Sequence, residues 1–467
     1  MAIADALSRN EDGIATALGI LAQRFGERFS TSAAVREHHG HTTTWITNQP
    51  PDGVVFVHST EEVAEVVRVC AEHHVPIIPF GTGSSLEGHL NAPAGGVSID
   101  LSSMNRILAV HPEDLDCVVE PGVTRKQLNE HLRDTGLFFP IDPGADASLG
   151  GMASTRASGT NAVRYGTMKD NVLNLTAVMP DGAIVRTAQR AKKTSAGYDL
   201  TRLLVGAEGT LGVITELTLR LQGIPEAISA GVCSFPDVES ACNTVIATIQ
   251  SGIPMARIEL LDTLQMRACN AYSKLDYPEA PTLFLEFHGT TAGVKEQAEL
   301  FGDIAEEFGG GNFSWTTRQE DRARLWQARH DAYWAAISLR PGTKAFATDA
   351  CVPLSRLADC VRGTMDDIAE LGLIAPIVGH VGDGNFHVSA LIDMDDPAEL
   401  DKAQQLSARI SARAIGMDGT CTGEHGIGQG KRAYLEQELG PALDVMRAVK
   451  RAIDPQNIMN PGKIIRL

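Results

Sequence analysis

The sequence predicts an α+β protein of more than one domain, and three observations support this prediction. Strand-type and helix-type patterns alternate from Gly53 onward. The sequence pattern changes near residue 225, after which strand and helix patterns follow one another as β-α-β units. The length of 467 residues allows two or three domains of ordinary size. We therefore expect a helical N-terminal segment over 1–49, one domain over 50–225 and another over 226–467.

The first domain is expected to open with a strand, a helix and a second strand. The β-branched run GVVFVH begins at Gly53, and Ser59 and Glu62 then form a capping box for a helix that ends near His74. The apolar run VPIIPF follows and leads directly into a glycine-rich loop. Further strands are expected at GVSIDL, CVVEPG and LFFPID, with a helix over 125–135.

The second domain is expected to contain three β-α-β units. The first is AGVCSF, a helix over 238–250 and ARIELLD. The second is LFLEFHG, a helix over 295–308 and NFSWTT. The third is KAFATDACVP, a helix over 355–370, and the strands PIVGHV and FHVSALID. Units of this kind predict sheets with helices on one face.

Three glycine-rich segments indicate close approach of the backbone to a ligand. The loop Gly81-Thr-Gly-Ser-Ser85 follows a strand, but Leu86 stands where a Rossmann fingerprint needs its third glycine and no helix pattern follows at once. Such a turn can still bind a diphosphate through its N–H groups and hydroxyls. The segment 143–166 is rich in small residues without periodicity, which favours a ligand cradle over disorder. The third segment is GAEGTLGVIT, over 206–215.

Two histidines and a glutamate form a candidate metal site. Asp383-Gly384 predicts a two-residue hairpin turn, which would pair His380 with His387 on one face with Cβ atoms about 4.5–5.5 Å apart. Glu424 lies in a glycine-flanked segment that can present its carboxylate to the same place. Two imidazoles and one carboxylate leave coordination positions open, as in catalytic sites, and both Zn and Mn suit them. We interpret the nearby Cys421 as a packing thiol.

Composition and charge exclude several classes of protein. The net charge is −18, and no Lys/Arg block offers a nucleic-acid surface. The N-terminus lacks a signal peptide, and no run reaches the roughly 18 apolar residues that span a bilayer. Eight scattered cysteines indicate reduced thiols rather than disulfides. We expect a cytoplasmic protein. The alternatives are a peripheral location at the inner membrane and, if a presequence has been removed, a mitochondrial location, and a homodimer is the assembly that we consider.

The glycine segments together with HVGDGNFH and GEHG resemble the FAD-binding oxidase/transferase type 4 family of the vanillyl-alcohol-oxidase superfamily. The resemblance runs from about residue 50 to the C-terminus and is closest to the branch of cytochrome-type D-lactate dehydrogenases, glycolate oxidases and D-2-hydroxyglutarate dehydrogenases. It implies a two-subdomain, PCMH-type FAD-binding domain and a ferredoxin-like α+β cap domain, with 420–467 returning to the flavin. FAD would be non-covalent, because the flavin loops contain no His or Cys for attachment.

The resemblance also implies the residues of each site. The metal, Zn or Mn, would be bound by His380, His387 and Glu424. FAD would be contacted along the three glycine segments and near the C-terminus, by Gly81, Thr82, Gly83, Ser84, Ser85, Pro143, Gly144, Asp146, Ala147, Gly150, Gly151, Ser154, Ser158, Gly159, Thr160, Ala162, Glu208, Gly209, Gly212, Ile214 and Asn460.

The expected substrate is a short D-2-hydroxy acid, most of all D-lactate, which would be oxidised to pyruvate. By the resemblance, Arg329, Lys344 and Asn385 would bind it, His425 would be the general base, and the bulky Tyr333 would shorten the pocket. Glycolate and D-2-hydroxyglutarate are the alternatives. A zinc hydrolase would leave the glycine segments unexplained, and Arg329 and His425 argue against a non-catalytic flavin subunit. Because no haem or iron–sulfur motif is present, electrons would pass to a separate acceptor, namely cytochrome c, a quinone or an electron-transfer flavoprotein.

Overall fold

The computed structural model describes residues 7–467, which form two compact units. Among the described residues, the first unit comprises 7–158, Gly166–Ile224 and Glu424–Leu467. The second comprises Gly159–Tyr165 and Pro225–Gly423. The chain therefore passes from the first unit to the second at Ile224–Pro225, and the C-terminal 44 residues, Glu424–Leu467, belong to the first. No helix within 7–467 has both the length and the apolar character needed to cross a bilayer.

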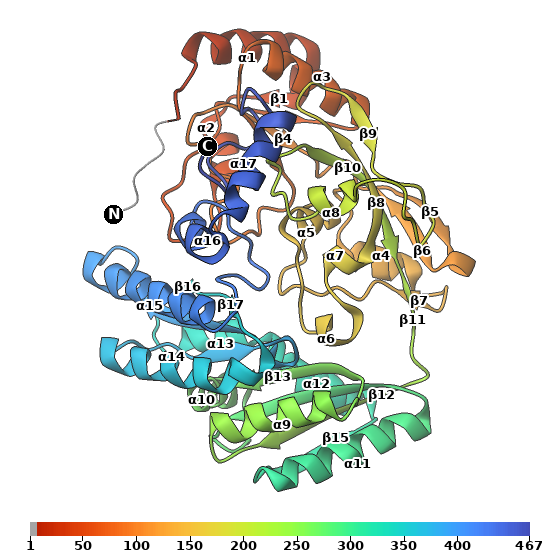
Figure 1. Ribbon diagram of the computed structural model, residues 1–467, viewed down its shortest axis with the longest axis vertical. Coiled ribbons are helices and arrows are strands. Elements are labelled where there is room, and N and C mark those ends of the chain that lie inside the picture. Colours follow the sequence, from red (N-terminus) through yellow and green to blue (C-terminus); the bar gives the residue numbers. More distant parts are fainter. Residues whose placement is uncertain (1–6) are drawn as a thin grey trace. The chain divides into compact units, whose positions relative to one another are not determined.

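The first unit contains a four-stranded sheet in the order β1-β2-β4-β3. The strands are β1 (Phe29–Ser30), β2 (Gly53–Phe56), β3 (Ile77–Phe80) and β4 (Val97–Asp100), and β2, β4 and β3 run parallel. The helices α1 (Glu11–Phe25) and α3 (Thr60–Glu72) pack their apolar faces into the same core as this sheet (Figure 1). A second helix near the N-terminus, α2 (Ala33–Gly40), packs against β2.

A five-stranded antiparallel sheet completes the first unit, in the order β5-β6-β10-β8-β9. Its apolar core also holds residues of short helices and Leu137 of β7, a strand that pairs with β11. The strands are β5 (Ile107–His111), β6 (Asp116–Val119), β7 (Leu137–Phe138), β8 (Val172–Val178), β9 (Ile184–Arg186), β10 (Val213–Arg220) and β11 (Gln222–Gly223). The helices are α4 (Arg125–Leu132), α5 (Leu149–Thr155), α7 (Met168–Asn171) and α8 (Leu200–Leu204).

The C-terminal segment packs along the edge strand β3 of the first sheet. After α16 (Arg432–Leu439) and α17 (Ala442–Ile453), the backbone N–H of Ile77 donates to the carbonyl of Ile458 at 2.8 Å, and the N–H of Asn460 donates to the carbonyl of Ile77 at 2.8 Å. Ile458 and Met459 enter the core of this sheet. The chain therefore adds a strand-like segment directly beside the strand that precedes the glycine loop.

The second unit contains one large antiparallel sheet in the order β15-β12-β14-β13-β18-β19-β16, with β17 paired to β19. The strands are β12 (Ala227–Ser234), β13 (Met255–Leu261), β14 (Thr282–Gly289), β15 (Gly311–Thr316), β16 (Lys344–Ala347), β17 (Ala350–Cys351), β18 (Ile377–Gly379) and β19 (Asn385–Ile392). The order of its first four strands, fourth-first-third-second along the chain, is that of a ferredoxin-like fold. The predicted α+β class and ferredoxin-like domain are therefore confirmed.

The three predicted β-α-β units are present, but helices cover both faces of the sheet. Helix α9 (Val238–Gln250) has the predicted bounds, whereas α11 (Thr291–Glu307) starts one turn earlier than predicted, capped by Thr290. Phe287 contacts Phe301 of α11, whereas Phe284, on the opposite face of β14, packs with α10 (Thr263–Ser273), α12 (Gln319–His330) and α13 (Ala332–Ser338). The expectation of helices on one face was wrong, because α10, α12 and α13 form a second layer on the opposite face.

Several local predictions also need correction. The segment 143–166 is not without structure, since it contains α5 and α6 (Ala162–Tyr165). Ser59 caps α3 as expected, but the carboxylate of Glu62 accepts from the N–H of His58 and pairs with Arg28 instead of closing a capping box. The second unit also contains α14 (Leu357–Leu371) and α15 (Pro397–Gly416), of which only the first was predicted.

Candidate active site

The glycine loop after β3 is a compact turn with no helix behind it. Between β3 and β4 the chain forms bends and turns, which confirms that the loop is not a Rossmann fingerprint. A Cβ atom on Gly81 would lie 2.3 Å from the hydroxyl oxygen of Ser148, and Gly83 has a φ of +70°. The backbone N–H of Ser148 donates to the hydroxyl of Thr82 at 3.4 Å. The loop is therefore packed directly against the start of α5.

The other two glycine segments meet at the opposite end of α5. The N–H of Gly206 donates to the carbonyl of Ala153 at 2.9 Å, and the N–H of Glu208 donates to the carbonyl of Ser154 at 2.9 Å. The side chain of Asn460 donates to the carbonyl of Glu208 at 2.8 Å. Residues from three glycine segments and the C-terminal segment thus converge in the first unit, around α5 and β3. We call this region the flavin cradle.

The flavin cradle contains buried polar atoms that suit a bound dinucleotide. The hydroxyls of Ser85 and Ser148 and the amide oxygen of Asn460 are buried and have no hydrogen-bond partner among residues 7–467. A buried polar group left without a partner costs about 1–3 kcal/mol, so such groups usually face a ligand or water. Hydroxyls beside a glycine turn are the donors that a diphosphate needs. The residues present therefore fit FAD.

Glu208 ties the C-terminal segment to the flavin cradle. Its carboxylate accepts from the N–H groups of Ile427 at 2.7 Å and Gly428 at 2.8 Å, and lies 3.2 Å from Nε2 of His89. Burial alone would raise the pKa of Glu208, but His89 and the two N–H donors outweigh burial and hold its pKa below the ordinary value. Glu208 itself adopts a φ of +52°, a conformation that an ordinary residue adopts only under constraint.

The remaining predicted flavin residues are distributed unevenly. Ile214 belongs to the apolar core of the first unit, and Gly212 packs on the carbonyl of Val178. Asp146 accepts from the N–H of Lys126 at the start of α4, at 3.3 Å. Gly159, Thr160 and Ala162 belong to the second unit. The contacts proposed for the others stay predictions: Pro143, Gly144 and Ala147 lie in the loop before α5, Gly150 and Gly151 lie within α5, and Ser158 lies after the end of α5.

His380 and His387 come from a hairpin whose register differs from the prediction. Val378 pairs with His387, so His380 does not stand directly opposite His387 and the connection is a five-residue loop, His380–Gly384, with a 3-10 turn. The two-residue turn was wrong because Gly384, at φ +78°, ends that 3-10 turn. The register slips by two residues, which keeps both side chains on one face. Their ring centroids are 5.3 Å apart.

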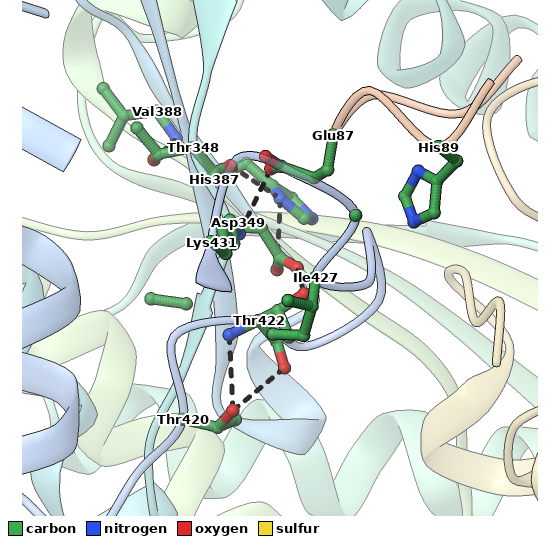
Figure 2. Close-up of polar contacts among 12 residues, drawn as sticks. Glu87, His89, Thr348, Asp349, His387, Val388, Thr420, Thr422, Ile427 and Lys431 are labelled. Atoms are coloured by element: carbon green, nitrogen blue, oxygen red, sulfur yellow. Dashed lines mark hydrogen bonds and ion pairs between the residues drawn. The ribbon is translucent and has the colours of Figure 1, made fainter. Parts of the chain in front are cut away.

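The Nδ1 atom of each histidine is hydrogen-bonded to an acceptor in the second unit. Nδ1 of His380 lies 2.7 Å from Oε1 of Glu259, and Nδ1 of His387 lies 3.2 Å from the carbonyl of Thr348. Figure 2 shows Thr348 and Asp349 beside His387. A neutral imidazole that donates from Nδ1 carries its lone pair on Nε2. The two rings are thus set in the tautomer that metal-binding histidines adopt.

Glu424 supplies the carboxylate of the group. The segment 419–423 is fixed to β17 by a bridge between Cys351 and Thr420, and Glu424 follows directly after Gly423. Ligand atoms of His380, His387 and Glu424 all lie within 4.8 Å of one another. That set of donors fits a divalent ion with open coordination positions.

The sequence did not direct attention to Glu259, which is completely buried in β13. Besides His380, its carboxylate accepts from Arg329 at 3.0 Å and 2.6 Å. Burial alone would raise the pKa of Glu259, but the charges and hydrogen bonds of His380 and Arg329 outweigh burial and lower it. The signal that could have identified Glu259 is a carboxylate placed between the apolar residues Ile258 and Leu260 of a predicted strand, because a buried charge needs a partner.

The predicted substrate residues have diverse surroundings. Arg329 is paired with Glu259, and Asn385 donates to Asp349 at 2.7 Å and to the carbonyl of Ala350 at 2.8 Å. Lys344 is exposed at the start of β16, and Tyr333 is 38% exposed on α13. His425 follows Glu424 in the C-terminal segment. No observation tests the substrate-binding role of the first four or the catalytic role of His425, so these roles stay predictions.

The fold and the flavin cradle together define an FAD-dependent oxidoreductase. Residues 51–188 match the model of an FAD binding domain, and residues 224–464 match that of the C-terminal domain of FAD linked oxidases. The chain belongs to this family of FAD-linked oxidases. Among solved structures, p-cresol methylhydroxylase has the same fold, with a TM-score of 0.80 at 19% identity over 98% of this chain and 97% of that one.

Three relatives narrow the comparison. A probable D-lactate dehydrogenase, mitochondrial, of Danio rerio is 53% identical over 94% of this chain and 90% of its own length. The D-lactate dehydrogenase [cytochrome], mitochondrial, of Arabidopsis thaliana is 49% identical over 89% and 73%. A glycolate oxidase subunit of Bacillus subtilis is 34% identical over 94% of each chain. The expected cytoplasmic location stays a prediction beside the mitochondrial names of the first two relatives.

Proposed function

We propose that this chain oxidises D-lactate to pyruvate with FAD and a divalent metal, and passes the electrons to a separate acceptor. The proposal is supported by the names of the relatives from Danio rerio and Arabidopsis thaliana, which are named as D-lactate dehydrogenases. One geometric observation carries the proposal. Ligand atoms of His380, His387 and Glu424 lie within 4.8 Å of one another, and Nδ1 of each histidine is hydrogen-bonded to an acceptor in the protein.

When bound, FAD would supply a hydride acceptor and Zn or Mn would supply a Lewis acid for the substrate hydroxyl, which is chemistry that side chains lack. His380, His387 and Glu424 would hold the metal. Arg329 orients the substrate carboxylate through its guanidinium. Glu259 accepts a hydrogen bond from that guanidinium and thereby keeps it fixed. His425 takes the proton of the substrate hydroxyl, as a general base.

Glycolate oxidation is the second candidate, because the glycolate oxidase subunit of Bacillus subtilis matches over 94% of this chain. D-2-hydroxyglutarate is the third substrate to compare. Tyr333 favours the short acids, since its ring, packed edge-on against Trp334 at 5.2 Å, would fill space that a second carboxylate needs. Tyr333→Ser should therefore raise kcat/KM for D-2-hydroxyglutarate relative to D-lactate.

The test of the proposed function is anaerobic bleaching of the flavin spectrum by D-lactate, L-lactate, glycolate and D-2-hydroxyglutarate in separate reactions. We expect the fastest bleaching with D-lactate, and loss of bleaching after chelation with EDTA that Zn or Mn restores. His425→Ala should retain FAD and metal but reduce the flavin at least 100-fold more slowly. Bleaching that is unaffected by both chelation and His425→Ala would refute the metal and base assignments.

A further inference from the structure

One part of the FAD-binding sequence region packs with the second unit. Residues 159–165 lie within 51–188, which match the FAD binding domain, and they include the proposed flavin contacts Gly159, Thr160 and Ala162. In the structure, however, Gly159–Tyr165 belongs to the second unit, the unit that also holds His380 and His387. The helix in this segment is α6 (Ala162–Tyr165).

Three polar contacts hold this segment on the sheet of the second unit. The phenol of Tyr165 lies 2.7 Å from Nδ1 of His288, and Nε of Arg257 donates to the amide oxygen of Asn161 at 2.9 Å. Arg164 donates to the carbonyl of Pro254. These contacts fix both ends of α6 to β13, β14 and the loop before β13.

The imidazole of His288 that contacts Tyr165 is itself held by a carboxylate. His288 Nε2 lies 2.8 Å from the carboxylate of Glu286, and both side chains are buried. Burial alone would raise the pKa of Glu286, but Arg257 and His288 outweigh it and keep this carboxyl charged. A charged Glu286 accepts from Nε2–H of His288, so the ring is held in place beside the phenol of Tyr165.

The loop that carries the metal histidines packs directly on α6. Gly382 lies two residues after His380, and a Cβ atom built on it would be 2.6 Å from Cγ2 of Val163 and 2.6 Å from Cγ2 of Ile258. Real Cβ atoms essentially never come so close to another heavy atom. Gly382 therefore allows the histidine loop to rest against α6 on one side and β13 on the other.

From these contacts we propose that α6 is a positioning element, which sets the spacing between the flavin-contacting segment and the metal-binding histidines. The inference rests on the proposed function, because it takes Gly159–Ala162 to touch FAD and His380 to bind the metal. Hydride transfer requires reacting atoms about 3–3.5 Å apart, so a displacement of α6 by one ångström should slow it strongly. None of the residues of α6 needs to contact the substrate for this effect.

The first experiment displaces the loop from α6 and then restores the space. Gly382→Ala should lower the rate of flavin reduction by D-lactate about tenfold or more and change the visible circular dichroism of bound FAD. Adding Val163→Ala, which removes the clashing methyl on α6, should restore part of both. The matched control is Gly311→Ala, also in the second unit, whose Cβ would have no atom within 4 Å.

Variants of the two residues next to Gly382, Val163 and Ile258, distinguish the proposed role of α6 from a general disruption of the loop. If Ile258→Ala restores the rate and the spectrum while Val163→Ala does not, the strain acts through the sheet and the role of α6 is refuted. A Gly382→Ala protein with the rate and flavin spectrum of the wild type also refutes it.

The second experiment disturbs α6 from its other end and does not depend on the folding of Gly382→Ala. Tyr165→Phe removes the bond to His288 and should weaken FAD binding about fivefold to tenfold, measured by quenching of flavin fluorescence. Tyr198→Phe is the control, because Tyr198 is 95% exposed. Unchanged FAD affinity and circular dichroism in Tyr165→Phe would overturn the proposal. If D-lactate fails to bleach the wild type, the proposed function fails, whereas the FAD affinities and spectra of these variants still decide the role of α6.

Discussion

Replacing Glu259 by glutamine removes the negative charge that contacts Nδ1 of His380, while keeping the shape of the side chain. The carboxylate accepts from His380 at 2.7 Å and from Arg329 at 2.6 Å, and it is completely buried. Loss of such a partner behind a metal ligand typically weakens metal binding about 10- to 100-fold, or about 1.4–2.7 kcal/mol. We therefore expect Glu259→Gln to weaken binding of Zn or Mn by that factor.

The measurement is a titration of metal-stripped, FAD-loaded protein against a competing chelator dye. Asp262→Asn is the control, since Asp262 is a buried carboxylate at the end of the same strand that caps α10 instead of contacting a histidine. Its affinity for the metal should stay within about twofold of the wild type. An affinity of Glu259→Gln that is indistinguishable from this control would show that the charge behind His380 does not support the metal, contrary to our reasoning.

Three further predictions concern the first unit. Gly81→Ala should weaken FAD binding at least tenfold, because its Cβ would lie 2.3 Å from the hydroxyl of Ser148, whereas Gly19→Ala, with open space around it, should leave fluorescence titrations unchanged. Glu208→Gln should lower the free energy of unfolding by about 2 kcal/mol at pH 7. Because the pKa of Glu208 in the folded protein is lowered from 4.5, the difference in melting temperature between the wild type and this variant should shrink as the pH falls below 4.5. Burial lowers the pKa of Lys463 from 10.5 to about 7, so the wild type should gain stability relative to Lys463→Met between pH 7 and 10. Melting temperatures of the two proteins that change in parallel over this pH range would contradict the prediction.

The fold was predicted where local periodicity and burial coincide. The helix over Val238–Gln250 has the bounds expected from its apolar spacing, since six of its side chains are buried on one face. Helix α10 was missed because its apolar pattern is weak: its buried side chains are only Gln265, Met266, Ala268 and Cys269. Short helices such as α5 were also missed, since Gly, Ala, Ser and Thr carry no hydrophobic pattern and only tertiary packing makes them helical.

The candidate site was predictable to the extent that its residues are close in sequence. His380 and His387 flank one turn, so their shared face follows from strand geometry even though the register was wrong by two residues. Glu259 lies 121 residues from His380 and contacts it only because β13 and β18 are neighbours in the sheet. Sequence spacing contains no information on that adjacency, which arises from the order of strands.

The placement of α6 and of the C-terminal segment bears on how this chain can be divided. A single cut near residue 225 would leave the later fragment without Gly159–Tyr165, so that Arg257 and His288 would lose their partners Asn161 and Tyr165. The earlier fragment would lose the residues that bond to Ile77 along β3 and to Glu208. Neither half is therefore an autonomous folding module, and attempts to shuffle domains with relatives should exchange these short segments together with the bodies on which they pack.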